Sequence, residues 1–166
     1  MPNDREAVDR LGKVFFDSYF VVDRERRIET FNEGFVQMLG LRPAERRQIR
    51  GSFCYDLLRL EICKDRCIAL EALAKGDHVR KEEIRGTTAN GREVVLERSA
   101  MPLRDESGQV VGVFVTDRDV TDERRLKTRY LEESEAHRQE RDTLLRIIRD
   151  RDEDLGEVRA QLKTKK

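Results

Sequence analysis

The sequence predicts an α+β domain in which a five-stranded antiparallel sheet carries helices on one face and a long C-terminal helix follows. Along the chain the patterns run as two strands, several short helices and three strands. All seven phenylalanines lie between residues 15 and 114, so this part can bury a core. Residues 117–166 contain neither Phe nor Pro and one Gly, which suits a long helix. We therefore divide the chain into an N-terminal helical cap (1–18), a core domain (19–118) and a helical tail (119–166).

Charge and hydropathy argue against several classes of protein. The 166 residues include 34 basic and 34 acidic side chains, whereas a nucleic-acid-binding protein usually needs a basic face. No window approaches the ~18 apolar residues that a membrane-spanning helix needs, and the N-terminus lacks the apolar segment of a signal peptide. We expect a cytoplasmic protein with reduced cysteines and with neither a nucleic-acid nor a membrane partner.

Two strand patterns open the core domain. Tyr19–Asp23 is rich in aromatic and β-branched residues, and Arg27–Phe31 alternates polar and apolar residues. The polar residues between them predict a hairpin turn. Asn32 is a suitable N-cap for a helix that Gly40 ends.

The middle of the chain is predicted to be helical. Pro43 suits the first turn of a short helix that runs through Ile49. Residues 53–75 then place leucine and isoleucine side chains at helical spacing, and Gly76 ends the run.

Three longer strands close the core domain. They are predicted over Val79–Thr87, Glu93–Pro102 and Val110–Thr116. Asn90-Gly91 is a strong tight-turn pair between the first two. The third strand is almost entirely apolar, as a buried central strand would be.

Two stretches of this pattern resemble the PAS family. The first is YFVVDRERRIETFNEGFVQMLG, and the second is ANGREVVLERSAMPLRDESGQVVGVFVTDRDVTD. They carry the N-G turn, the P-L-x-D-x-x-G stretch, the aliphatic last strand and the D-x-T junction that PAS domains typically show. The resemblance covers about residues 10–122 and implies a PAS fold and a bacterial-type sensory module of signal transduction.

The junction after the last strand is a candidate for signal relay. Asp119 and Thr121 are both competent N-caps, and Glu123 favours a helix N-terminus. The strand therefore runs almost directly into the tail helix. A short stiff connection of this kind would pass strain from the sheet to the helix.

The tail predicts a parallel dimeric coiled coil, with a single solvated helix as the alternative. Its seam is polar in the first half and apolar from Leu144 onward, and an imperfect seam of this kind permits switching. His137 is better explained as a polar seam residue than as a phosphoacceptor. The heptad positions of the seam are Tyr130, Ser134, His137, Arg141, Leu144, Ile148, Arg151, Leu155, Val158 and Leu162.

The three cysteines form the main candidate input site. Cys54, Cys63 and Cys67 fall within fourteen residues, and clustered thiolates suit an iron–sulfur cluster or another soft metal ion. Three nearby basic residues favour thiolates: Arg59, Lys64 and Arg66. A fourth ligand could be His78, a carboxylate such as Asp65, or a small thiol, or the site could have no fourth ligand.

The cysteine pattern also resembles a PAS subgroup found ahead of bacterial sensor kinases and enhancer-binding transcription regulators. That resemblance implies a redox, oxygen or metal input. Two alternatives remain open, namely thiol–disulfide switching and three buried thiols that act as small apolar residues. Haem on His78 is a further alternative, whereas the N-C-R-F-L-Q-like helix of flavin photosensors is missing.

These patterns together predict a non-enzymatic module. We expect a homodimer that senses its signal at the cysteines and relays it through the junction to a partner kinase or transcription regulator. The alternative is a ligand-free dimerisation scaffold. No nucleotide-binding glycine loop, Ser/His/Asp grouping or pair of catalytic carboxylates indicates an enzyme.

Overall fold

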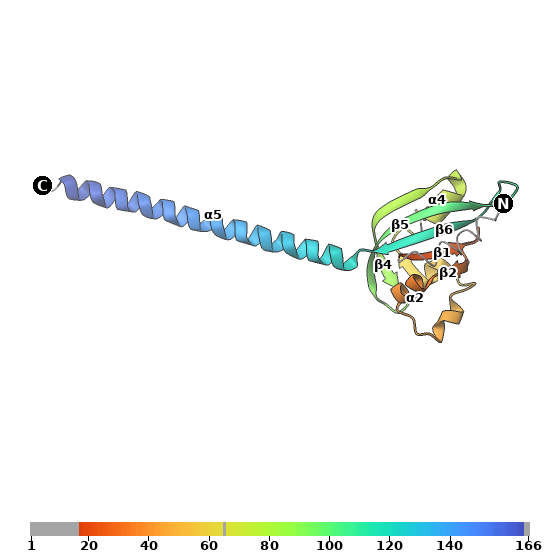
Figure 1. The fold of residues 1–166 in the computed structure, drawn as a ribbon. Coiled ribbons are helices and arrows are strands. Elements are labelled where there is room, and N and C mark those ends of the chain that lie inside the picture. The colour runs from red at the N-terminus through yellow and green to blue at the C-terminus, as the bar shows by residue number, and fades with distance from the viewer. Residues whose placement is uncertain (1–16, 65, 165–166) are drawn as a thin grey trace. The chain divides into compact units, whose positions relative to one another are not determined.

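The structure is a computed structural model, and it describes residues 17–64 and 66–164, with side chains described as far as residue 156. The chain forms two compact units, of which one ends at Asp122 and the other begins at Glu123 (Figure 1). The N-terminal helix predicted within residues 1–18 lies almost entirely outside the described residues.

The first unit is built on an antiparallel sheet with the strand order β2-β1-β6-β5-β4-β3. The two chain-terminal strands of this unit, β1 and β6, lie side by side in the middle of the sheet (Figure 1). The strands are β1 (Ser18–Val22), β2 (Ile28–Phe31), β3 (Leu58–Leu60), β4 (Val79–Thr88), β5 (Glu93–Arg104) and β6 (Val110–Asp119).

One face of the sheet is covered by the segments between β2 and β4. The apolar residues of these segments join the inward side chains of the strands in one core, which includes Phe20, Phe35, Ile68 and Leu96. The helices are α2 (Glu33–Leu39), the 3-10 helix η1 (Glu45–Gln48), α3 (Cys54–Leu57) and α4 (Ile68–Lys75). The predicted α+β fold with helices on one face is confirmed.

The sheet has six strands rather than the five predicted. The helical reading of residues 53–75 was wrong for Leu58–Leu60, which form β3 and pair with β4. Leu58 and Leu60 are buried and Arg59 is exposed, so this segment alternates with the period of a strand. The spacing of Leu58 and Leu60 is compatible with a helix as well as with a strand. The segment forms a strand because it pairs with the free edge of β4.

Short-range polar contacts fix α2 as the sequence predicts. The Asn32 side chain accepts a hydrogen bond from the Phe35 amide at 3.0 Å, and it also accepts one from the Tyr19 amide at 2.9 Å. Gly40 ends α2 with a φ of 64°, a left-handed conformation that favours glycine. A Cβ at this position would meet the Asn90 side-chain amide, which would have to move.

A buried ion pair lies at the centre of the inward sheet face. Arg98 on β5 and Asp117 on β6 are direct cross-strand partners. The Arg98 guanidinium donates to both carboxylate oxygens of Asp117, from Nε at 2.6 Å and from Nη2 at 2.7 Å. It also lies 5.4 Å from the centre of the Phe20 ring. The two residues are 4% and 1% exposed, so each charge depends on the other for its stabilisation.

The opposite face of the sheet carries a second, smaller apolar cluster. Tyr19, Val21 and Leu103 are buried there, and Val111 and Phe114 pack against them. The Tyr19 and Phe114 rings lie 5.3 Å apart. Strand alternation therefore supplies apolar residues to both faces of β1 and β6, which agrees with their central positions.

The second unit is the part of α5 that begins at Glu123. The whole helix α5 (Thr121–Thr164) has 44 residues. Its exposed apolar side chains gather in two groups, before residue 132 and after residue 143, and they mark an interaction surface. No helix in the described part of the chain is long and apolar enough to span a membrane. The exposed apolar residues are Leu126, Tyr130, Leu131, Leu144, Leu145, Ile147, Ile148 and Leu155.

Breaking the buried ion pair should destabilise the first unit strongly. We expect Asp117→Asn to lower the free energy of unfolding by about 3–5 kcal/mol, because it leaves the Arg98 charge buried and without its counter-ion. Replacing both residues with apolar ones, as in Arg98→Met/Asp117→Leu, should recover most of this loss. The measurement is urea unfolding followed by near-ultraviolet circular dichroism.

An exposed cross-strand pair provides the matched control. Arg80 and Glu97 lie 3.4 Å apart, with side chains 55% and 21% exposed. Glu97→Gln should cost less than about 1 kcal/mol. If Glu97→Gln and Asp117→Asn lowered the free energy of unfolding equally, burial would not determine how much the Arg98–Asp117 pair contributes to stability.

Candidate functional site

The junction between β6 and α5 is held to the neighbouring strand by specific hydrogen bonds. A single residue, Val120, separates the end of β6 from the start of α5. The Val120 amide donates to the Val95 carbonyl, and the Val95 amide donates to the Thr121 hydroxyl, each at 2.9 Å. Thr121 in turn donates from its amide, at 3.0 Å, and from its hydroxyl to Oδ1 of Asp119. The first residues of α5 are thus fixed against β5.

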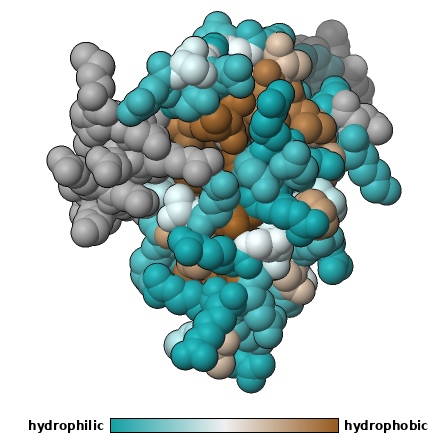
Figure 2. Space-filling view, turned by 90° about the vertical axis from the view of Figure 1, so that its right-hand side faces the viewer, coloured by the Kyte–Doolittle hydropathy of each residue, from teal (hydrophilic) through white to brown (hydrophobic). Residues whose placement is uncertain are grey.

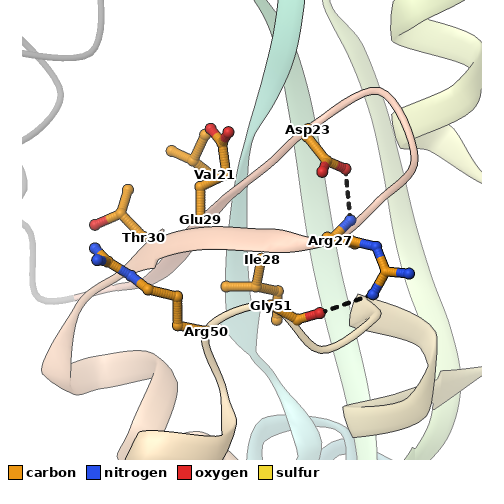
Figure 3. Close-up of a pocket in the computed structure, with 8 residues that line it drawn as sticks. All are labelled: Val21, Asp23, Arg27, Ile28, Glu29, Thr30, Arg50 and Gly51. Carbon is orange, nitrogen blue, oxygen red and sulfur yellow. Dashed lines mark hydrogen bonds between the residues drawn. The ribbon is translucent and has the colours of Figure 1, made fainter.

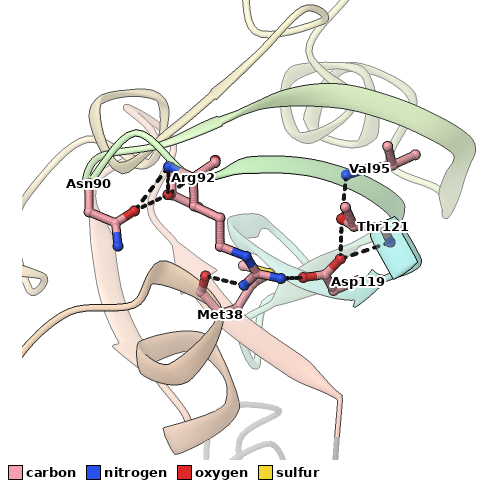
Figure 4. Close-up of polar contacts among 7 residues, drawn as sticks. Met38, Asn90, Arg92, Val95, Asp119 and Thr121 are labelled. Atoms are coloured by element: carbon pink, nitrogen blue, oxygen red, sulfur yellow. Dashed lines mark hydrogen bonds and ion pairs between the residues drawn. The ribbon is translucent and has the colours of Figure 1, made fainter. Parts of the chain in front are cut away.

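Arg92 connects this junction to α2 (Figure 4). Its Nη2 donates to Asp119, and its Nη1 donates to the Met38 carbonyl in the last turn of α2 at 3.2 Å. Asn90, in the same β4–β5 turn, donates to the Gly40 carbonyl at 3.2 Å. The turn therefore holds the C-terminal end of α2 and the start of α5 at once. We call Asn90, Arg92, Asp119 and Thr121 the junction cluster.

Two of the four residues of the junction cluster are those that the sequence predicts as relay residues, and their relay role stays a prediction. Asp119 and Thr121 were predicted as relay residues, and Asp119 does accept the amide of Thr121 at the start of α5. Arg92 was missed because a single arginine in a charged stretch gives no sequence signal. Asn90 was recognised as a turn residue, but its bond to α2 spans fifty residues of sequence and could not be predicted.

The three cysteines border the same apolar core beside α3 and α4. Cys54 is the first residue of α3 and is 4% exposed. Cys63 and Cys67 lie before α4, where both are partly buried and pack against that core. Cys63 donates a hydrogen bond from its thiol to the Leu58 carbonyl at 3.5 Å. The fold thus brings the predicted cysteines to one side of the core.

Burial holds two of these thiols in the protonated form. It raises the pKa of Cys54 from 9.0 to about 12, and the positive charge of Arg98 only partly opposes that rise. Burial also raises the pKa of Cys63. The expected effect of Arg59, Lys64 and Arg66 is not found, since the cations that act on Cys54 and Cys63 are Arg98 and Arg26.

The structure assigns no metal centre to the predicted ligands. Within residues 17–64 and 66–164, no group of three or more His, Cys, Asp or Glu side chains could hold a metal ion. His78 is exposed immediately before β4, and Asp65 lies outside the described residues. The donor set suits a soft metal in kind, but metal binding would require Cys54 and Cys63 to lose protons that burial retains.

Two cavities open on the surface near the β1–β2 turn. One of about 680 Å³ lies beside the cysteine segment and is lined by Arg26, Tyr55, Arg59, Leu60, Glu61, Cys63 and Lys64. Another of about 480 Å³ lies along β2, where Arg27 donates to the Gly51 carbonyl at 3.1 Å (Figure 3). The face seen in Figure 2 is largely hydrophilic and includes a hydrophobic area.

The profile of the PAS fold matches residues 16–125, which include the whole sheet and the junction cluster. The chain belongs to the PAS family. The first unit of the chain is therefore a sensory and signalling module. A comparison with curated proteins finds no match.

Solved PAS domains share the fold of the first unit, which we call the PAS unit from here on. A PAS domain from Colwellia psychrerythraea has a TM-score of 0.58 at 21% identity and covers 72% of this chain and 99% of its own. The PAS domain of the fruit-fly ELK potassium channel has a TM-score of 0.56 at 17% identity, covering 70% and 96% of the two chains. The PAS domain of nitrogen regulation protein NR(II) from Vibrio parahaemolyticus has a TM-score of 0.53 at 14% identity, covering 66% and 94%. Identities this low support the fold and not a ligand.

Aromatic side chains fill the space between α2 and the sheet of the PAS unit. Phe20 of β1 and Phe35 of α2 are fully buried, and their ring centres lie 4.7 Å apart. Phe31 of β2 lies 6.3 Å from Phe35. At the end of α2 that contacts Arg92, Met38 and Leu39 are also buried in this core, so a displacement of α2 would reach the junction cluster.

The buried thiol of Cys54 should react slowly in the native protein. With a pKa of about 12, Cys54 carries very little thiolate near pH 8. We expect iodoacetamide to alkylate Cys54 roughly a thousandfold more slowly in the native than in the urea-unfolded chain, with the rate rising as pH increases toward 12. The measurement is mass spectrometry of a Cys63→Ser/Cys67→Ser variant, in which Cys54 is the only thiol. Equal rates in the two states would contradict the burial of Cys54.

Proposed function

We propose that this PAS module senses redox state, oxygen or a metal at Cys54, Cys63 and Cys67 and relays the change through the junction cluster to α5. The module acts without catalysis of its own, as a cytoplasmic homodimer. Its output passes to a partner protein, such as a sensor kinase or a transcription regulator. The observation that carries this proposal is the bridge that Arg92 makes between α2 and Asp119.

The bridge supports relay because it joins the core to the output helix by charge-assisted bonds. One guanidinium binds the last turn of α2 and the carboxylate beside the first residue of α5. A shift of α2 would therefore move or break the Arg92–Asp119 pair. Asp119 also accepts the amide and the hydroxyl of Thr121, so the same shift would disturb the start of α5.

The cysteines support the input half of the proposal by their common location. They lie against the core that α2 also contacts, and the charge of Arg98 acts on Cys54 and Cys63. Ionisation of these thiols by metal binding would place negative charge beside the Arg98–Asp117 pair. Disulfide formation, in which two thiols pass two electrons and two protons to an oxidant such as oxygen, would instead draw two segments together.

A ligand-free scaffold is the second candidate function, and the state of Cys54 favours it. A thiol that is 4% exposed, with a pKa of about 12, behaves as a small apolar residue. In that case the cysteines would only fill the core. The module would dimerise and present its surface to a partner without a chemical input.

A spectrum of protein purified without oxygen separates the two candidates. We expect bound metal, or iron and sulfide with broad visible absorption, that is lost in Cys63→Ala. If no metal is found, sensing requires a reversible disulfide that forms in air and is absent from the same variant. A colourless, metal-free protein that forms no disulfide would leave only the scaffold. Ser99→Ala, on a partly exposed residue of β5, is a control that should change neither result.

The homodimer rests on the apolar half of the α5 seam. Leu144 and Ile148 follow heptad spacing and are 53% and 57% exposed in the single chain. Leu155 continues the seam and is 54% exposed. The polar residues Ser134, His137 and Arg141 occupy the preceding seam positions, so pairing should be strongest toward the C-terminal end of α5.

Charged substitutions in the seam should dissociate the dimer. We expect Leu144→Asp/Ile148→Asp to shift the protein to a monomer, because each carboxylate would be buried against its copy. The measurement is sedimentation equilibrium across a range of concentrations. Arg146→Asp lies on the outer side of the heptad and should remain dimeric. A dimer that survives the double substitution would place the interface elsewhere.

A further inference from the structure

We propose that the cavity beside the β1–β2 turn binds a small amphipathic carboxylate, an acid with an aromatic or short aliphatic body. The cavity has a volume of about 680 Å³, within the range of ~300–1,000 Å³ that is usual for small-molecule sites. This inference requires no chemistry at the thiols. It gives the module an input distinct from the redox or metal input proposed above.

Four segments supply the wall of the cavity. Arg26 comes from the β1–β2 turn, Tyr55 from α3, and Arg59 and Leu60 from β3. Glu61, Cys63 and Lys64 follow β3 and complete the lining. A ligand here would contact the hairpin and the cysteine segment at once, so its binding would alter how these segments pack together.

The charges around the cavity favour an anion. Three of its lining side chains are cationic and one is anionic. Within the described residues, Arg59 and Lys64 form no ion pair, while one oxygen of Glu61 accepts the Arg85 amide at 3.4 Å. Arg59 and Lys64 therefore leave positive charge at the cavity that a carboxylate would match.

Arg26 is held in place at a conformational cost. Its φ of 70° is the left-handed conformation that glycine or asparagine usually adopts. Its guanidinium lies 4.5 Å from the centre of the Tyr55 ring and donates to the Cys63 carbonyl over a long 3.4 Å. Tyr55 stacks in turn on Phe53 at 5.0 Å. A strained residue that directs a partly bonded guanidinium along a cavity is typical of a binding site.

The apolar part of the lining defines the rest of the ligand. Tyr55, Leu60 and Cys63 offer apolar surface, and the aliphatic stems of the arginines extend it. The cavity along β2 lacks this combination, because its lining holds two acidic side chains, Asp23 and Glu29, and two basic ones, Arg27 and Arg50. An acid with an apolar body therefore fits the cysteine-side cavity better than either a neutral molecule or a bare inorganic anion.

Calorimetric titration with 4-phenylbutyrate tests the proposal, with 4-phenylbutyramide as the neutral probe of the same shape. The titration uses the full chain with a reductant and a chelator present, so that thiol and metal chemistry cannot contribute. We expect the amide to bind at least about tenfold more weakly than the acid, because it lacks the charge that pairs with the cations. The acid should also slow labelling of Cys63 by N-ethylmaleimide.

Removing the cationic side chains of the cavity should likewise weaken binding of the acid. Arg59→Gln/Lys64→Gln should weaken binding of the acid about tenfold or more. Arg26→Gly should do the same while relieving the strained φ, so misfolding would not explain the result. Arg24→Gln, on an exposed arginine of the same turn that does not line the cavity, should leave affinity within about twofold.

Three outcomes would overturn the proposal. They are equal binding of acid and amide, unchanged affinity in the cavity variants, and no binding of the acid up to its solubility. None of these outcomes bears on the cysteine proposal, which the anaerobic spectrum tests separately.

Discussion

The buried pair of Arg98 and Asp117 is the interaction on which the rest of the structure depends. Both charges lie inside the sheet–helix core, where either alone would be costly. Because the two residues are direct cross-strand partners, they fix the register of β5 against β6. A shift by one residue would turn Asp117 to the other face and leave Arg98 without its counter-ion. The pair therefore selects one alignment of the two middle strands of the sheet.

That alignment determines the geometry at the start of α5. Two residues beyond Asp117, β6 ends at Asp119 opposite Leu96, which brings Thr121 within hydrogen-bonding distance of Val95. Arg92, at the start of the same hairpin, then reaches both Asp119 and the end of α2. The hairpin of β4 and β5 is thus bonded both to the end of α2 and to the first residues of α5. In the relay proposed above, a shift of α2 would reach α5 through these bonds.

Local features could be predicted from the sequence, and long-range partners could not. Asn32 and Gly40 cap α2 as expected, because capping depends on residues within one or two turns. The helical reading of Leu58–Leu60 was wrong because an open strand edge, which no local pattern reveals, decides their structure. The spacing of the cysteines located them together but did not reveal their burial, which raises the pKa of Cys54 and Cys63. Arg92 and Arg98 carried no signal, since their partners lie far along the chain.

Hydrogen exchange at residues 119–129 tests most directly whether Arg92 couples α2 to α5. Gly40→Ala perturbs the end of α2, where a Cβ would meet Asn90, and Arg92→Gln removes the bridge. If the bridge carries the coupling, Gly40→Ala accelerates exchange at residues 119–129 in the wild-type background but adds nothing once Arg92→Gln is present. Equal effects of Gly40→Ala in both backgrounds would contradict the account, because α2 would then act on α5 without Arg92.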